Sequence, residues 1–310
     1  MSLFWEFLFF LKEFAVSFLR FLPRSWRTPV YLVGFILTTN PALATKLPPS
    51  VAVFDWTIAE TLLSLDPSAV SLGNTAAFHK WTGDNYKDVD IIDIGTQTFP
   101  NMELLSSIEP HHILLSPSQV RLGQRLANIA PYTIIQSYPY VGNRSGRLWS
   151  SFDAFALEIG VSVDQKAVAE QLIMDTRSHL EELRSNLSSQ PPLLVIQLVN
   201  EHYVRVYGEN SMFQEVLRQL NLSNAWTEKT NQWGYSLVSI RELFNVEEAR
   251  LIVIESAFPI GIENNIETSG MWRYLPSVQQ GDSVVLSSSF WIAGALPSAQ
   301  RFANALVKAL

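Results

Sequence analysis

Short apolar runs alternate with stretches of helical pattern through the first half of the chain. The runs expected to form strands lie at residues 49–54, 69–72, 91–94, 112–115 and 133–135, and the expected helices lie at 58–65, 100–108 and 122–129. Because strands that alternate with helices are typical of mostly parallel sheets covered on both faces, this half predicts an α/β lobe over residues 45–161. Ligands of such sheets bind beyond the carboxyl ends of the strands.

A second α/β pattern begins after residue 190. Its expected strands lie at residues 192–198, 205–207, 251–254 and 283–286, and its expected helices lie at 210–220, 239–244, 271–275 and 297–310. We interpret residues 190–310 as a second lobe, and residues 230–236 as a loop inside it.

One long helical stretch separates the two patterns. Apolar side chains recur at three- and four-residue spacing from Val163 to Leu187, and Ser162 with Gln165 has the spacing of a capping box. A helix of this length measures about 37 Å at 1.5 Å per residue. We expect residues 162–189 to connect the two lobes as a brace. An ordinary crossover helix inside one domain is the alternative.

The first 44 residues have the pattern of an export signal. Arg24 and Arg27 precede an apolar run at residues 30–37, and Ala42-Leu43-Ala44 is typical of a cleavage site. The apolar run is short for a bilayer span. A second apolar, aromatic segment at residues 4–22 is unusual for a signal peptide, and a retained membrane anchor is the alternative. We expect residues 1–44 to be a signal peptide with an N-terminal extension.

Composition narrows the possible functions. The chain has 310 residues, a formal net charge of −7 and no cysteine. The acidic balance argues against nucleic acid as a partner, and the absence of cysteine excludes a thiol nucleophile, a thiolate metal site and a disulfide framework. Nine tryptophans are many for this length. Tryptophan suits the binding of flat or apolar ligands.

Motifs for catalysis are missing from the sequence. The five histidines have no metal-ligand spacing, and neither a G-x-S-x-G elbow nor a P-loop lysine motif occurs. We interpret Asp93 as a strand-end residue and Glu60 as a residue of a helix surface. The sequence therefore predicts no enzyme, no cofactor and no protein-held metal, and a hydrolase is the less favoured alternative.

Five sequence blocks, taken together, carry a resemblance to a known family. They occur in order at residues 94–105, 208–217, 224–226, 232–240 and 290–295. With them, the chain from about Val51 to Leu310 resembles the solute-binding proteins of ABC importers for iron-siderophores and cobalamin, and in particular those for ferric hydroxamates. The resemblance implies two α/β lobes joined by one long rigid helix (the helical-backbone metal-receptor type). It also implies a monomeric periplasmic protein that delivers a ferric siderophore to an inner-membrane permease.

The resemblance also implies which residues hold the ligand. The siderophore already supplies every ligand of the iron, so the protein contributes aromatic walls and hydrogen-bond donors. The family's cleft tryptophans match Trp81, Trp233 and Trp291, whereas we interpret Trp56 and Trp226 as structural.

Three positions depart from the family pattern. In the resembled family, an arginine of the cleft occupies the position of Gln97, a tyrosine that of Gln119, and a serine that of Tyr235. Glutamine donates hydrogen bonds but lacks the charge of arginine. Two explanations stay open: Arg121 supplies the missing charge, or the ligand is a different siderophore or one with less negative charge.

Two further expectations concern partners. In the resembled family, one glutamate on each lobe docks with the permease, and the matching positions are Glu103 and Glu215. Carboxylates are also common in the first turn of a helix because of its dipole. A heme- or cobalamin-binding relative is the alternative to a siderophore binder. Heme would require an axial ligand, for which Tyr235 or His79 is available.

Overall fold

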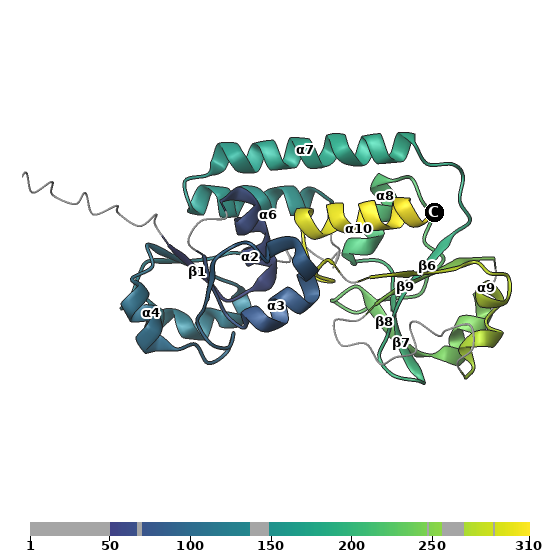
Figure 1. Cartoon of the computed structure of the whole chain (residues 1–310), viewed down its shortest axis with the longest axis horizontal. Coiled ribbons are helices and arrows are strands. Elements are labelled where there is room, and N and C mark those ends of the chain that lie inside the picture. The colour runs from purple at the N-terminus through teal and green to yellow at the C-terminus, as the bar shows by residue number, and fades with distance from the viewer. Residues whose placement is uncertain (1–49, 67–69, 137–148, 247, 256–269, 288) are drawn as a thin grey trace, which may run out of the picture. The chain divides into compact units, whose positions relative to one another are not determined.

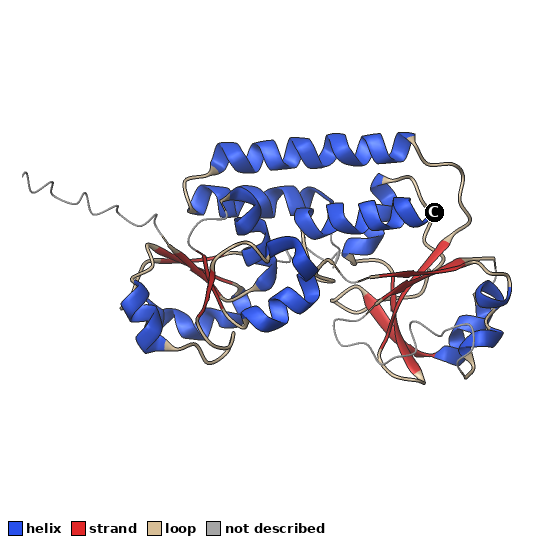
Figure 2. Ribbon diagram, viewed as in Figure 1, coloured by secondary structure: helices blue, strands red, loops and turns tan. Residues whose placement is uncertain are grey.

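The computed structural model describes residues 50–66, 70–136, 149–246, 248–255, 270–287 and 289–310. The predicted signal peptide lies outside these residues. Within the unit from Leu47 to Leu310, two five-stranded sheets are covered by helices (Figures 1 and 2). Among the described helices, none combines the length and the apolar character that a bilayer crossing requires.

The first sheet is parallel throughout. Its order is β3-β2-β1-β4-β5, and its strands are β1 (Val51–Val53), β2 (Val70–Leu72), β3 (Ile91–Asp93), β4 (His112–Leu115) and β5 (Tyr132–Ile134). The connecting segments include α2 (Trp56–Leu65), α3 (Thr75–Thr82), η2 (Gly83–Tyr86), α4 (Met102–Ile108), η3 (Pro117–Leu122) and α5 (Gly123–Leu126). Each of the five strands coincides with a predicted apolar run.

The second sheet mixes parallel and antiparallel strands. Its order is β10-β9-β6-β7-β8. Strands β6 (Leu193–Leu198), β9 (Arg250–Ile254) and β10 (Ser283–Leu286) are parallel to one another, and β7 (Tyr203–Tyr207) is antiparallel to both of its neighbours, β6 and β8 (Tyr235–Ser239). Its helices are α8 (Met212–Gln219), η4 (Ile240–Asn245), η6 (Trp272–Tyr274), α9 (Pro276–Gln279) and α10 (Leu296–Ala309). The strand β8 begins inside the segment that we expected to be a loop.

The long helix is shorter than predicted and belongs to a helical hairpin. Helix α6 (Trp149–Ser162) precedes α7 (Lys166–Ser185), and α7 measures about 30 Å at 1.5 Å per residue. The predicted capping box is wrong, because the Ser162 hydroxyl donates to the Glu158 carbonyl oxygen inside α6 and Gln165 caps α7 without a side-chain bond. Helix α7 packs against α6, α10, α2 and α8, and so contacts helices of both lobes (Figure 1).

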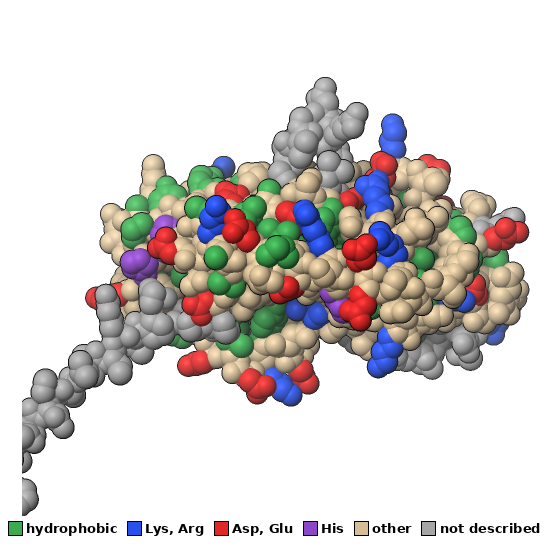
Figure 3. All heavy atoms as spheres, turned by 90° about the horizontal axis from the view of Figure 1, so that it is seen from above, with side chains coloured by type: hydrophobic (Ala, Val, Ile, Leu, Met, Phe, Trp, Pro, Cys, Tyr) green, Lys and Arg blue, Asp and Glu red, His purple; other side chains and the backbone are tan. Residues whose placement is uncertain are grey.

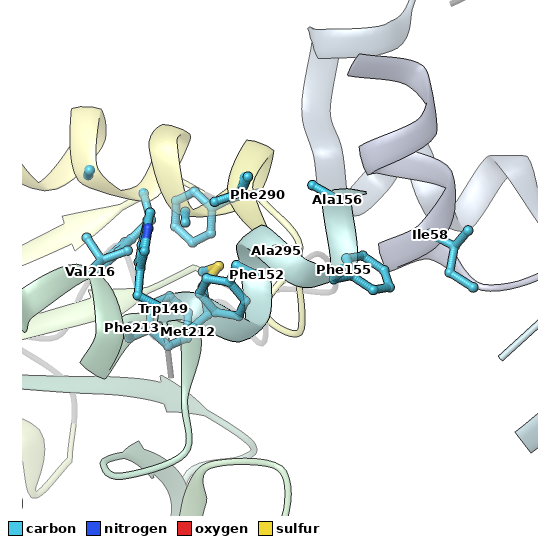
Figure 4. Close-up of a cluster of buried hydrophobic side chains, with 14 of the residues drawn as sticks. Ile58, Trp149, Phe152, Phe155, Ala156, Met212, Phe213, Val216, Phe290 and Ala295 are labelled. Atoms are coloured by element: carbon cyan, nitrogen blue, oxygen red, sulfur yellow. The ribbon is translucent and has the colours of Figure 1, made fainter. Parts of the chain in front are cut away.

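One hydrophobic core is shared by the two sheets. It contains Val53 and Leu72 of the first sheet, Val195 and Ile252 of the second, and aromatic side chains of the helices between them. Figure 4 shows part of it, with Phe152 and Trp149 of α6 close to Phe213 of α8 and to Phe290. Separate smaller clusters lie on the other face of each sheet. The shared core ties both lobes to the helical layer.

The outer face of this helical layer carries charges of both signs. Figure 3 shows Lys and Arg interspersed with Asp and Glu on the face seen from above. On α7, Lys166 pairs with Glu170 and Arg184 pairs with Glu181. Exposed pairs of this kind contribute little to stability, and this face has no region of single-sign charge.

Candidate functional site

The carboxyl ends of the first sheet bring several predicted residues to one edge. Trp56 follows β1, Trp81 lies in the helix after β2, Gln97 follows β3, and Arg121 lies in η3 after β4. The loop after β3 approaches the loop after β2 closely, because a Cβ atom at Gly73 would lie 3.3 Å from the Gln97 backbone nitrogen.

Three tryptophans meet at this edge. The ring centroids of Trp81 and Trp291 are 5.0 Å apart at an interplanar angle of 76°, and those of Trp56 and Trp291 are 5.1 Å apart at the same angle. All three side chains are half-buried. Trp56, which we interpreted from its sequence context as structural, is therefore also part of the aromatic cluster. The signal for this was its position directly after a strand end.

Hydrogen bonds fix the orientation of two of these rings. Trp56 Nε1 donates to the Gly73 carbonyl oxygen at 3.0 Å, and Trp291 Nε1 donates to the Thr57 hydroxyl at 3.2 Å. The Thr57 hydroxyl donates in turn to the Ala293 carbonyl oxygen at 3.2 Å. The segment around Trp291 is thus attached to the start of α2.

A buried carboxylate completes this attachment. Glu60 is fully buried, its Oε2 accepts from the Ser298 hydroxyl at 2.6 Å, and its Oε1 forms an ion pair with Arg301. The Ser298 hydroxyl oxygen also accepts from the Trp291 backbone N–H at 2.7 Å. Burial lowers the pKa of Arg301 to about 10. The interpretation of Glu60 as a surface residue is wrong, because the partners that bury it come from the far end of the chain.

The other two predicted aromatic residues lie at the edge strand of the second sheet. Trp233 occupies the turn before β8 and is 49% exposed. Gly234 has a φ of +80°, and a Cβ atom there would lie 2.5 Å from the Ser211 backbone, so only glycine fits this turn. Tyr235 is half-buried and packs edge-on against Tyr207, with ring centroids 6.2 Å apart.

The polar ligand-binding candidates of the first lobe differ in burial and in hydrogen bonding. Gln119 is buried, and its Oε1 accepts from the Ser116 backbone N–H at 2.9 Å and from the Ser116 hydroxyl at 3.0 Å. Its oxygen therefore caps η3, which leaves the amide nitrogen as the group that can donate to a ligand. Gln97 is half-buried, and Arg121 is exposed.

The two predicted docking carboxylates have opposite environments. Glu103 is exposed in the first turn of α4. Glu215 is only 3% exposed, its Oε2 accepts from the Trp149 backbone N–H at 2.9 Å, and its Oε1 pairs with Arg218. This burial argues against a docking role for Glu215, because a carboxylate enclosed by its own chain cannot reach an arginine of another protein.

The acidic side chains in the described part of the chain do not form a metal site. No cluster of three or more His, Asp or Glu side chains there could hold a metal ion. Asp93 accepts from the Thr75 backbone N–H at 3.0 Å, from the Thr75 hydroxyl at 2.6 Å and from the Gly95 backbone N–H at 2.8 Å. It therefore ties the loop after β3 to the start of α3, as expected of a strand-end residue.

Comparisons with known proteins agree with this architecture. A family model described as "Periplasmic binding protein" matches residues 51–289. The iron(3+)-hydroxamate-binding protein FhuD of Escherichia coli strain K12 is 25% identical over 302 residues, covering 93% of this chain and 96% of the relative. The petrobactin-binding protein YclQ of Bacillus subtilis strain 168 is 23% identical over 266 residues, covering 82% and 80%.

A solved structure supports the same relationship. The structure of Fe3+-Desferal-bound siderophore-binding protein FhuD from Vibrio cholerae is similar to this chain with a TM-score of 0.74 and 26% identity, over 84% of this chain and 97% of that one. Because the family model covers most of the sequence, the chain belongs to the periplasmic binding protein family. The members of this family are binding proteins that act outside the cytoplasm, which confirms the prediction that the chain is not an enzyme. The predicted fold class is confirmed as well.

Proposed function

We propose that this chain is the substrate-binding component of an ABC importer and captures a ferric siderophore of the hydroxamate class. The observation that carries the proposal is the meeting of Trp81 and Trp291, which are 210 positions apart in sequence and have ring centroids 5.0 Å apart. The Escherichia coli relative is named for binding iron(3+)-hydroxamate, and the Vibrio cholerae relative is seen with Fe3+-Desferal bound; both support the choice of ligand class.

In this proposal the protein leaves the iron coordination untouched. Indole faces of Trp81 and Trp291 pack against the organic part of the siderophore, and Trp233 and Tyr235 approach from the second lobe. The amide nitrogens of Gln97 and Gln119 donate to ligand oxygens. Binding then depends on apolar burial and hydrogen bonds, which a metal-free siderophore of different shape satisfies less well.

The ligand class is tested by titration. Purified protein is titrated with ferrioxamine B, metal-free desferrioxamine B, hemin and cobalamin, and binding is followed by calorimetry, tryptophan fluorescence and absorbance. We expect ferrioxamine B to bind and quench tryptophan fluorescence, and metal-free desferrioxamine B to bind more weakly. Binding of only hemin or only cobalamin would replace the proposed ligand with one of the alternatives, and a spectral shift of hemin on binding would reveal an axial protein ligand such as Tyr235 or His79.

We further propose that the protein works as a monomer in the periplasm and delivers its ligand to an inner-membrane permease. The export signal expected in residues 1–44 fits this location, as does the family. Glu103 is the proposed docking carboxylate of the first lobe, since it is exposed on α4.

A further inference from the structure

Arg205 is a half-buried cation beside the proposed ligand residue Tyr235. It lies on β7, and its guanidinium carbon is 5.2 Å from the centroid of the Tyr235 ring. Its Nη1 donates to Gln197 Oε1 at 2.9 Å, and the Tyr207 hydroxyl donates to the same oxygen at 3.1 Å. These neighbours hold the guanidinium in place, but none of them carries a charge.

The other half-buried arginines have a carboxylate partner. Among the residues that the structure describes, three arginines are half-buried: Arg205, Arg250 and Arg301. Arg250 pairs with Asp282 and Arg301 pairs with Glu60, whereas no described carboxylate lies within ion-pair distance of Arg205. Partial burial of a charge is unfavourable unless an opposite charge compensates it. Among the described residues, Arg205 is therefore the half-buried arginine that can accept an anion from a ligand.

Arg205 lies on a face of its sheet that solvent can reach. Side chains alternate across a strand, so Val204 and Val206 point into the core of the second lobe and Arg205 points to the opposite face. On that opposite face, Tyr203 is 49% exposed and Leu237, which pairs with Arg205 in register, is 59% exposed. Solvent reaches this face, and the same face carries Tyr235.

We propose that Arg205 binds an anionic group of the ligand and thereby selects ferric hydroxamate complexes that carry a negative charge, such as a carboxylate. The inference rests on the proposed function. It places on the second lobe the positive charge that Gln97 does not supply on the first. A guanidinium has five N–H donors, and the one directed at Gln197 leaves others for charge-assisted bonds to a carboxylate.

Two probes with the same iron coordination but different charge isolate the effect of the charge on binding. The terminal amine of desferrioxamine B is acetylated in one probe and succinylated in the other, and both are loaded with iron. The three hydroxamates are the same in both complexes, but the succinyl complex ends in a carboxylate. We expect the protein to bind the succinyl complex about tenfold more tightly, and this preference to shrink as salt is raised.

Variants assign the preference to one arginine. Arg205→Gln should lose the preference and keep the affinity for the acetyl complex, and Arg205→Lys should keep part of the preference. Arg241→Gln, at an exposed position of η4, is the matched control and should behave as wild type. Arg121→Gln tests the first lobe and should keep the preference. Thermal melts verify that each variant is folded, and the salt dependence of the wild type tests the inference without any variant.

The outcomes distinguish this inference from the proposed function. Equal affinity of the wild type for both complexes, or a preference that survives Arg205→Gln, would overturn the role of Arg205 alone. A preference lost in Arg121→Gln but kept in Arg205→Gln would assign the charge to the first lobe. Failure of the wild type to bind either complex would instead reject a hydroxamate ligand.

Discussion

Trp291 contributes both to the proposed ligand site and to the contacts that hold the fold together. Its ring touches Trp56 and Trp81, its Nε1 donates to Thr57, and its backbone N–H donates to Ser298. We predict that Trp291→Ala weakens the binding of ferrioxamine B by about 1–3 kcal/mol, because it removes the indole surface against which the ligand packs. Calorimetric titration measures the effect.

A control separates this loss of affinity from a loss of folding. Trp291→Phe removes the indole N–H but keeps an aromatic ring, so most of the affinity should remain. Circular dichroism of both variants checks the fold. Unchanged affinity of a folded Trp291→Ala variant would show that the side chain serves the protein core and not the ligand.

Glu215 makes stability depend on pH in a defined direction. Burial raises its pKa above the ordinary value of 4.5, against the opposing effects of Arg218 and of the Trp149 backbone N–H. The folded chain thus keeps this proton at pH values where the unfolded chain has lost it, so the contribution of Glu215 to stability falls as pH rises from about 4.5 through the raised pKa. We predict that the free energy of unfolding of the wild type, relative to Glu215→Gln, increases as pH is lowered from 7 to about 4.5.

Urea unfolding at stepped pH measures this difference. Glu103→Gln, at an exposed position, is the control for removing a carboxylate from a first helical turn. A difference between wild type and Glu215→Gln that stays constant with pH would contradict the raised pKa.

Sequence patterns could identify some site residues and not others. Trp291 stands in one of the family-like blocks and Trp81 matches a cleft tryptophan of the resembled family, so both could be proposed from sequence, and the structure brings their rings together. Glu60 could not, because its burial depends on Ser298 and Arg301, more than 230 positions away. Glu103 and Glu215 look alike in sequence, since both lie in the first turn of a helix, and only tertiary packing separates the exposed from the buried one.

At the scale of elements, the contact of α6 with α7 depends on Gly160. A Cβ atom at this position would lie 2.6 Å from Ala169 Cβ and 3.0 Å from the Gln165 carbonyl oxygen. We predict that Gly160→Ala lowers the free energy of unfolding by about 1–3 kcal/mol, because overpacking forces the two helices apart. Thermal and urea unfolding measure the loss. Val161→Ala, at a neighbouring position that is 59% exposed, should change stability little. A Gly160→Ala variant as stable as the wild type would show that the hairpin adapts.

The attachment of α10 to α2 depends on a buried ion pair. We predict that Glu60→Met and Arg301→Met each destabilise the protein by about 3–5 kcal/mol, because each leaves one buried charge without its partner. The double variant should be less destabilised than the sum of the two, since it removes both charges. Urea unfolding of the four proteins gives the coupling free energy. Strictly additive losses would mean that Glu60 and Arg301 do not stabilise each other.

Element predictions failed where the hydrophobic pattern was weak or two-sided. The strands of the first sheet are short apolar runs and were predicted. Helix α6 buries Ser151 and Asp153 on either side of its apolar residues, so the buried arc is wide and partly polar, and it lacks the clear apolar stripe that identified α7. The edge strand β8 is polar at Ser236 and Ser239, and reads as a loop for that reason.

At the scale of the whole molecule, the shared core limits how far the lobes move. Side chains of both sheets pack into the same cluster with α6, α8 and α10. We therefore expect the lobes to close only slightly around a ligand, as the resemblance to rigid solute-binding proteins implied. In the proposed function, the permease then recognises the loaded protein through its surface rather than through a large rearrangement.

Glu103 is the surface residue on which that recognition is proposed to depend. Its carboxylate is exposed on α4, away from the helical layer formed by α6, α7 and α10 (Figure 1). We predict that Glu103→Arg leaves the affinity for ferrioxamine B unchanged and reduces iron uptake at least about tenfold, because charge reversal turns an attraction to permease arginines into a repulsion. Uptake of radioactive ferrioxamine B is measured in cells in which this chain is the only binding protein.

Glu182→Arg, which reverses an exposed charge on α7, is the control and should transport normally. Normal uptake with Glu103→Arg would reject the docking role, and a parallel loss of affinity and uptake would place Glu103 in ligand binding.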